Sequence, residues 1–322
     1  MRGRQPQPSV AVAGEELFSC YYKAKEVAQV YLNDFEYFSP KAAGEAFELV
    51  GRLGSKARVL AGGTDLLLMM KEKMIDPKYI IDINGVPDFK GISYEAGKGA
   101  VIGAFTKVSE IEHSALIREK YFALHQAAGE LGSAQVRAMA TIGGNSCHAS
   151  PAADTPTPLV ALGAKVLLSG NGGERQLPLE EFILGNRKTA LEEGELVTKF
   201  ILPDPAPRSA SRYWYIGLRG AMEIDAVNMA VYLVLEADGQ TVKEIKLVMG
   251  SVAPRPLILT EASTLLVGKK FDDALVEKVA VAACGEAKPI SDIRASAEYR
   301  LEMVGVLARR LLNEAFNAAQ EV

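Results

Sequence analysis

Two pairs of adjacent glycines constrain this chain more than any other feature: Gly62-Gly63, within Ala61–Asp65, and Gly143-Gly144, within Thr141–Asn145. Each pair follows a stretch that could form a short strand. Adjacent glycines let backbone N–H groups converge on one point and let an anion approach closely. Thr64 is a candidate cap for the apolar segment that follows the first pair. We interpret the two loops as a site for a ligand with two phosphates, although either pair alone is also typical of a tight turn.

Neither loop matches the common nucleotide-binding motifs. The GxxxxGK[ST] pattern of a P-loop is missing, and so is the GxGxxG pattern of a Rossmann fold. The sequence therefore indicates a different kind of dinucleotide-binding fold.

Composition excludes several classes of protein. The chain has 322 residues, of which 48% are hydrophobic, which is enough for two or three small domains. Its 36 basic and 40 acidic residues give a net charge of −4, unlike a dedicated nucleic-acid-binding protein. The three cysteines lie far apart, so we expect no iron–sulfur cluster or zinc held by this chain alone, and a reducing cytoplasm as its location. No apolar run is long enough for a membrane span, and the N-terminus lacks the apolar core of a signal peptide.

Periodicity and breakers predict four parts: a tail at 1–33, small α/β units at 34–88 and 89–205, and an α+β domain at 208–322. The segment 15–33 is predicted to be helical, either packed on its own domain or reaching a partner chain. Three prolines within 203–207 predict a linker. A hairpin is expected around Asp238-Gly239, followed by helices near 261–266, 273–283 and 297–319.

Three longer stretches resemble a known family: AGGTDLL, QVRAMATIGGNSCHASPAADTPTPLVAL and ISDIRASAEYRLEMVGVLARRLL. They are similar to the FAD-binding medium subunit of molybdenum hydroxylases, a family that includes carbon monoxide dehydrogenase and xanthine dehydrogenase. The resemblance runs from about residue 34 to 316 and implies an α+β fold. It implies a two-part FAD-binding domain of the vanillyl-alcohol-oxidase-like type, followed by a C-terminal domain of the CO dehydrogenase flavoprotein type. The 4-hydroxybenzoyl-CoA reductase variant is excluded, because this chain lacks the four-cysteine insertion.

The resemblance also implies which residues bind non-covalent FAD. Asp154 is expected to form a hydrogen bond with a ribityl hydroxyl, and the alternative is an Asx turn or a helix cap. Leu196 and Val197 are expected to lie in the segment that runs past the flavin ring, and the alternative is a buried strand. The implied FAD residues are Val59, Leu60, Ala61, Gly62, Gly63, Thr64, Asp65, Leu131, Thr141, Gly143, Gly144, Asn145, Asp154, Leu196 and Val197.

We expect no catalytic or metal-binding residue in this chain. Cys147 and His148 are adjacent, but neighbouring side chains on a strand point apart and are poorly placed to act together. Tyr215 and Leu218 stand where the family often has a lysine and an arginine, so the resemblance does not imply a basic group near the flavin ring from this strand.

The resemblance implies a role in electron transfer. Electrons would pass from a molybdopterin site on a large subunit, through [2Fe–2S] clusters on a small subunit, to FAD here and then to a small-molecule acceptor. The expected assembly is a dimer of heterotrimers. Two alternatives remain at this point: a self-contained FAD-dependent oxidoreductase of the same fold, and a non-catalytic nucleotide-binding assembly module.

Overall fold

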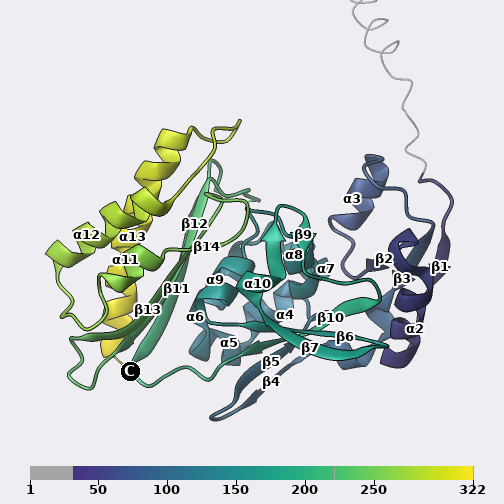
Figure 1. Cartoon of the computed structure of the whole chain (residues 1–322), viewed down its shortest axis with the longest axis horizontal. Helices are drawn as coiled ribbons and strands as arrows, with labels where there is room; N and C mark the ends of the chain where they lie inside the picture. The colour runs from purple at the N-terminus through teal and green to yellow at the C-terminus, as the bar shows by residue number, and fades with distance from the viewer. Residues whose placement is uncertain (1–31, 221, 322) are drawn as a thin grey trace, which may run out of the picture.

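The computed structural model describes residues 32–220 and 222–321, and these form three larger sheets in sequence order and one two-stranded ribbon (Figure 1). The sheets at the two ends of the chain lie on opposite sides of the molecule, with the second sheet between them. The predicted helix at 15–33 falls almost entirely outside the described residues. No helix in the described ranges has the length and apolar character needed to cross a bilayer.

The first sheet is parallel, with the order β1-β3-β2. Its strands are short, and each is connected to the next through helical segments, as parallel pairing requires. The helix α2 packs Ala46, Leu49 and Val50 against the core. The elements are β1 (Glu36–Phe38), α2 (Ala43–Leu53), η1 (Gly54–Lys56), β2 (Ala57–Leu60), α3 (Leu66–Lys71), β3 (Tyr79–Asp82), η2 (Ile83–Gly85) and η3 (Pro87–Phe89).

The second sheet is antiparallel, with the order β4-β5-β10-β6-β7. Its strands are β4 (Ile92–Glu95), β5 (Gly99–Gly103), β6 (Lys165–Gly170), β7 (Gly173–Pro178) and β10 (Glu195–Leu202), with the small ribbon β8 (Ile183–Gly185) and β9 (Lys188–Thr189) beside them. Its helices are α4 (Val108–His113), α5 (Ala115–Lys120), α6 (Phe122–Glu130), α7 (Ala134–Met139), α8 (Ile142–His148), α9 (Pro156–Ala161) and α10 (Leu179–Phe182). The proline-rich segment after β10 is irregular, as predicted.

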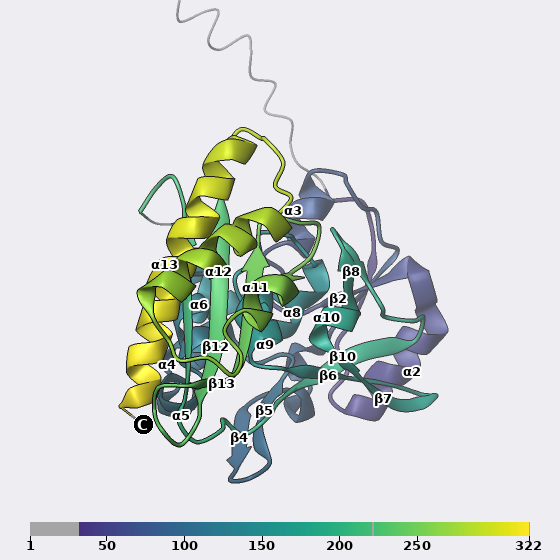
Figure 2. The ribbon, with the colours of Figure 1, turned by 60° about the vertical axis from the view of Figure 1, so that its left-hand side comes forward.

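The third sheet has the antiparallel order β11-β12-β13-β14 and lies between two helical layers. Three C-terminal helices cover one face (Figure 2), while α6 and α9 from the preceding part pack on the other. The elements are β11 (Ser209–Ile216), β12 (Val227–Leu235), β13 (Val242–Gly250), β14 (Leu257–Ile258), α11 (Thr260–Thr264), α12 (Asp273–Glu286) and α13 (Ala297–Gln320). The predicted hairpin is confirmed. The Asp238 carboxylate closes it by accepting hydrogen bonds from the backbone N–H groups of Gln240 and Thr241.

The prediction for the second glycine pair is wrong in its local structure. The element that precedes this glycine pair is helix α7 and not a strand. Gly143 and Gly144 lie in the first turn of α8 rather than in an open loop. Thr141 caps this helix, because its hydroxyl oxygen accepts the N–H of Gly144 at 3.0 Å. Cys147 and His148 therefore also lie on a helix, not on a strand.

Candidate functional site

A cleft of about 1,040 Å³ lies where the parts of the chain meet. Its walls are the first glycine loop, the segment from α7 to Asp154, and C-terminal residues from 223–225, 251–254 and 288–300. The volume is at the upper end of the ~300–1,000 Å³ range of ligand pockets, so a large ligand fits.

The first glycine loop provides the donors expected of an anion site. Within the part of the chain that the structure describes, the N–H groups of Gly62, Gly63, Thr64 and Asp65 donate no hydrogen bond. A side chain at Gly62 would place its Cβ 2.2 Å from the Met139 carbonyl oxygen, and Gly63 has a φ of +74° that favours glycine. The loop is thus a backbone cradle that larger residues would close.

The side chains of Asn84 and Asp65 make the contacts that hold this cradle, and the predicted cap by Thr64 does not form. Asn84, which the sequence analysis missed, donates from its amide to the Ala61 carbonyl oxygen at 2.7 Å. The N-cap position of α3 is Asp65, and no side chain bonds the first turn there, so the prediction for Thr64 is wrong. Asp65 instead lies 3.8 Å from His148 Nε2 and so brings the two glycine motifs together.

The second glycine pair does not offer free donors, which corrects the expectation that both loops would supply them. The N–H of Gly143 donates to the Ala104 carbonyl oxygen at 2.8 Å, and that of Gly144 donates to Thr141. A Cβ at Gly143 would meet the same Ala104 oxygen at 2.6 Å. These glycines therefore allow close packing of α8, and within Thr141–Asn145 the residues that reach the cleft are Thr141, Gly144 and Asn145.

Asn145 presents its amide group to the cleft in a fixed orientation. Its side-chain oxygen accepts the Thr155 hydroxyl at 2.6 Å. The amide NH₂ group is therefore the end of this side chain left to donate to a ligand.

Asp154 lies on the cleft wall and is not a helix cap. Its carboxylate accepts the Tyr213 hydroxyl at 3.1 Å, across to the C-terminal sheet. The N-cap of α9 is Thr155, without a side-chain bond. Burial raises the pKa of Asp154 to about 6. A half-buried carboxylate among few polar groups can bind a hydroxyl of a ligand strongly.

The cleft contains most, but not all, of the residues predicted to bind the cofactor. Val59, Ala61, Gly62, Gly63, Thr64, Asp65, Leu131, Thr141, Gly144, Asn145 and Asp154 line it, whereas Leu60, Gly143, Leu196 and Val197 do not. Leu196 and Val197 are 5% and 4% exposed and belong to the central strand β10. Their side chains pack in the hydrophobic core, which agrees with the buried-strand alternative.

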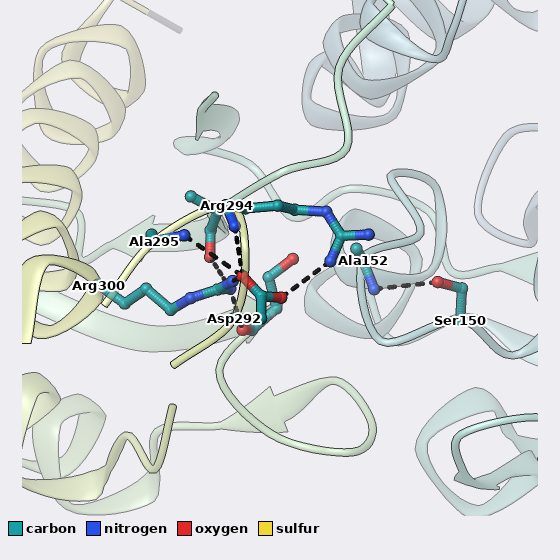
Figure 3. Close-up of polar contacts among 8 residues, drawn as sticks. Ser150, Ala152, Asp292, Arg294, Ala295 and Arg300 are labelled. Atoms are coloured by element: carbon teal, nitrogen blue, oxygen red, sulfur yellow. Dashed lines mark hydrogen bonds and ion pairs between the residues drawn. The ribbon is translucent and has the colours of Figure 1, made fainter. Parts of the chain in front are cut away.

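The C-terminal part contributes a cationic wall that was not predicted from the sequence (Figure 3). Asp292 binds the Arg294 guanidinium at 2.9 Å and the Arg300 guanidinium at 2.7 Å. Burial alone would raise the pKa of Asp292, but the hydrogen bonds from the Arg294 N–H and from Arg300 prevail and lower it to about 2. Figure 3 also shows the turn in which the Ala152 N–H donates to Ser150 on the facing wall. These residues fall in two of the motifs quoted above, but no local signal gave the arginines a role.

The cysteine in the cleft has the properties of a structural residue. Burial raises the pKa of the Cys147 thiol to about 12, so it is not a thiolate near neutral pH. Among the described residues, no group of three His, Cys, Asp or Glu side chains is arranged to hold a metal ion.

Comparison with known proteins identifies the family and the cofactor. A family model described as the FAD binding domain in molybdopterin dehydrogenase matches residues 33–205, and one described as the CO dehydrogenase flavoprotein C-terminal domain matches residues 212–315. The chain therefore belongs to the family of FAD-binding subunits of molybdenum hydroxylases, which are oxidoreductases, and FAD is its cofactor. The first glycine cradle, with its free N–H groups, fits the pyrophosphate of FAD.

Several relatives match over nearly their whole length. The carbon monoxide dehydrogenase medium chain of Hydrogenophaga pseudoflava is 36% identical, over 88% of this chain and 97% of the relative. The glyceraldehyde dehydrogenase medium chain of Sulfolobus acidocaldarius is 32% identical, over 88% of this chain and 99% of the relative. A structure of carbon monoxide dehydrogenase from Hydrogenophaga pseudoflava superposes with a TM-score of 0.84 at 35% identity, covering 89% of this chain and 99% of that one.

Proposed function

We propose that this chain is the electron-transfer subunit of a molybdenum hydroxylase complex. It holds FAD in the cleft, takes electrons from [2Fe–2S] clusters of a small partner subunit, and delivers them to a small-molecule acceptor. A large molybdopterin subunit oxidises the organic substrate. The observation that carries this proposal is the first glycine loop, whose free N–H groups lie at one end of a cleft large enough for a dinucleotide.

The chain's own residues bind and orient the cofactor. The N–H groups of Gly62 to Asp65 receive the pyrophosphate, and Asp154 accepts a hydrogen bond from a ribityl hydroxyl. Leu131 and Val59 supply apolar contacts along the wall. FAD, when bound, supplies the redox chemistry, so no side chain here needs to act as an acid or base on the organic substrate. We expect the binding to be non-covalent, and the un-ionised Cys147 thiol in the cleft supports this because it is a poor nucleophile at neutral pH.

The names of the relatives support partner subunits for this chain. Residues 32–220 and 222–321 hold no metal-binding cluster that could pass single electrons. The relatives are medium chains, a name that supports small and large companion chains here. We infer that the complex is a dimer of heterotrimers. We place it in the cytoplasm, because three scattered cysteines suit a reducing compartment.

Cofactor release and co-purification together test this proposal. The full chain, expressed with its neighbouring genes, is expected to co-purify with an iron–sulfur subunit and a molybdopterin subunit. Acid precipitation of the complex should release yellow FAD into the supernatant. Flavin that stays in the pellet would contradict non-covalent binding. A colourless protein would instead favour the assembly module, and a yellow chain that purifies alone would favour the self-contained oxidoreductase.

A further inference from the structure

Two carboxyl groups at the inner wall of the cleft, those of Asp154 and Asp225, share the Tyr213 hydroxyl as a hydrogen-bond partner. The Tyr213 hydroxyl is 3.1 Å from Asp154 Oδ1 and 3.2 Å from Asp225 Oδ2. Asp154 comes from the FAD-binding part, whereas Tyr213 on β11 and Asp225 just before β12 come from the C-terminal part. The Tyr213 hydroxyl therefore links two acids across the junction.

One hydroxyl proton cannot serve two carboxylates. If both acids were ionised, Tyr213 would donate to one, and its oxygen lone pairs would face the negative charge of the other. If Asp225 carries a proton, it donates to Tyr213, and Tyr213 donates to Asp154. The three groups all have complementary partners only when one of the two acids carries a proton, and the burial of the acids decides which one.

The next contact fixes Asp225 from its other side. Its Oδ2 accepts the Asn228 amide at 2.8 Å. The orientation of that amide is set by Thr157 on α9, whose hydroxyl donates to Asn228 Oδ1 at 2.8 Å. The chain of bonds thus runs from α9 through β12 to Asp225, then through Tyr213 to Asp154.

No cation compensates a second negative charge at this position. Within the described ranges, no lysine, arginine or histidine pairs with Asp154 or Asp225. Arg300 on α13 bonds the residue next to Asp225, but it donates to the carbonyl oxygens of Ala226 and Ser251 and to Asp292. The other ionisable groups around the pair are acidic or phenolic: Glu130 on α6, Glu223 in the preceding loop and Tyr215 on β11.

We propose that Asp225 is a neutral carboxylic acid at neutral pH, and that with Tyr213 it positions Asp154 as the single carboxylate offered to FAD. Asp225 is the better site for the proton because it is 3% exposed, whereas Asp154 is half-buried at the cleft. Burial, followed by the nearby charge of Asp154, raises the pKa of Asp225 well above its usual value. Asp225 is a positioning residue, and the inference rests on the proposed contact between Asp154 and FAD.

The location of the proton can be measured directly on the full chain. Infrared spectra at pH 7.5 are expected to show the carbonyl stretch of a neutral buried carboxyl group, and Asp225→Asn should remove this band. Asp204→Asn is the matched control, because the Asp204 carboxylate accepts hydrogen bonds from Tyr94 and Gly97 and its pKa is lowered. A band that is absent from the wild type, or that persists in Asp225→Asn, would overturn the proposal.

The pH profile of FAD binding provides a second test that a merely structural role would not pass. FAD affinity should fall as the pH drops through about 6, where Asp154 takes up a proton. If Asp225 is already neutral, Asp225→Asn leaves the midpoint of this fall unchanged, since one neutral group replaces another. If Asp225 is an anion, its removal lowers the pKa of Asp154 and shifts the midpoint to lower pH. Failure of the wild type to bind FAD would contradict the proposed function instead, and the infrared band would still report the state of Asp225.

Discussion

Single residues decide whether the cleft accepts a phosphate ligand. At the first loop, the requirement is the absence of a side chain, because Gly62 lies against the Met139 carbonyl and Gly63 has a left-handed backbone conformation. At the second loop, the same residue type serves packing, since the N–H of Gly143 is already bonded within the protein. Identical dipeptides therefore have different roles, which their tertiary neighbours determine.

We predict that Gly62→Ala strongly reduces FAD retention. The added Cβ would lie 2.2 Å from the Met139 carbonyl oxygen, so the loop must shift and its N–H groups lose their common direction. Flavin content per chain, measured by absorbance after gel filtration, checks this. Gly44→Ala is the matched control, because that glycine lies in α2 with no atom within 4 Å of its would-be Cβ. Full flavin content in Gly62→Ala would remove this loop from the site.

We predict a pH-dependent gain in stability for Asp154→Asn. The pKa of Asp154 is raised from 3.8 to about 6, so the native chain keeps a proton that the unfolded chain releases. The contribution of Asp154 is therefore fully favourable below about pH 4 and is lost as the pH rises through about 6. Urea unfolding of the apoprotein at pH 4.5, 6 and 7.5 should show the variant gaining relative to wild type with rising pH. A stability difference that is constant with pH would contradict this.

At the scale of elements, sequence patterns predicted the C-terminal hairpin, the long α13 and the proline-rich linker, because local periodicity and breakers determine them. The helical start of α8 was missed, since Thr-Ile-Gly-Gly is compatible with both a turn and a capped helix. Asp154 and the first loop follow from local motifs. The wall of Asp292, Arg294 and Arg300, and the links of Tyr213 and Asp225, arise only when segments far apart in sequence meet, so no local pattern could reveal them.

We predict that Thr141→Ala destabilises the apoprotein by about 1 kcal/mol, because α8 loses its side-chain cap. The melting temperature, followed by far-UV circular dichroism, should fall by a few degrees. Thr141→Ser keeps the hydroxyl oxygen and should retain most of the stability. Equal melting temperatures for the alanine variant and the wild type would show that the cap contributes nothing.

At the scale of the whole molecule, the cleft joins the FAD-binding part to the C-terminal part. Its walls include residues matched by both family models, and α6 and α9 pack on the C-terminal sheet behind it. A ligand that fills the cleft should therefore stabilise both parts together.

We predict that FAD raises the melting temperature of the apoprotein more than riboflavin does at equal concentration. Riboflavin lacks the pyrophosphate that the first loop is proposed to bind, so it binds more weakly and stabilises less by mass action. Differential scanning calorimetry measures both shifts. An equal shift with the two ligands would contradict the placement of the pyrophosphate at Gly62 and Gly63.

The central claim is that another protein must supply the electrons to the flavin of this chain. The most direct test follows flavin absorbance anaerobically while the FAD-loaded chain is mixed with carbon monoxide, aldehydes or purines. We predict no bleaching by any of these substrates for the isolated chain, and bleaching by the correct substrate once the small and large partner subunits are present. Rapid bleaching of the isolated chain by an organic substrate would contradict the account and identify a self-contained oxidoreductase.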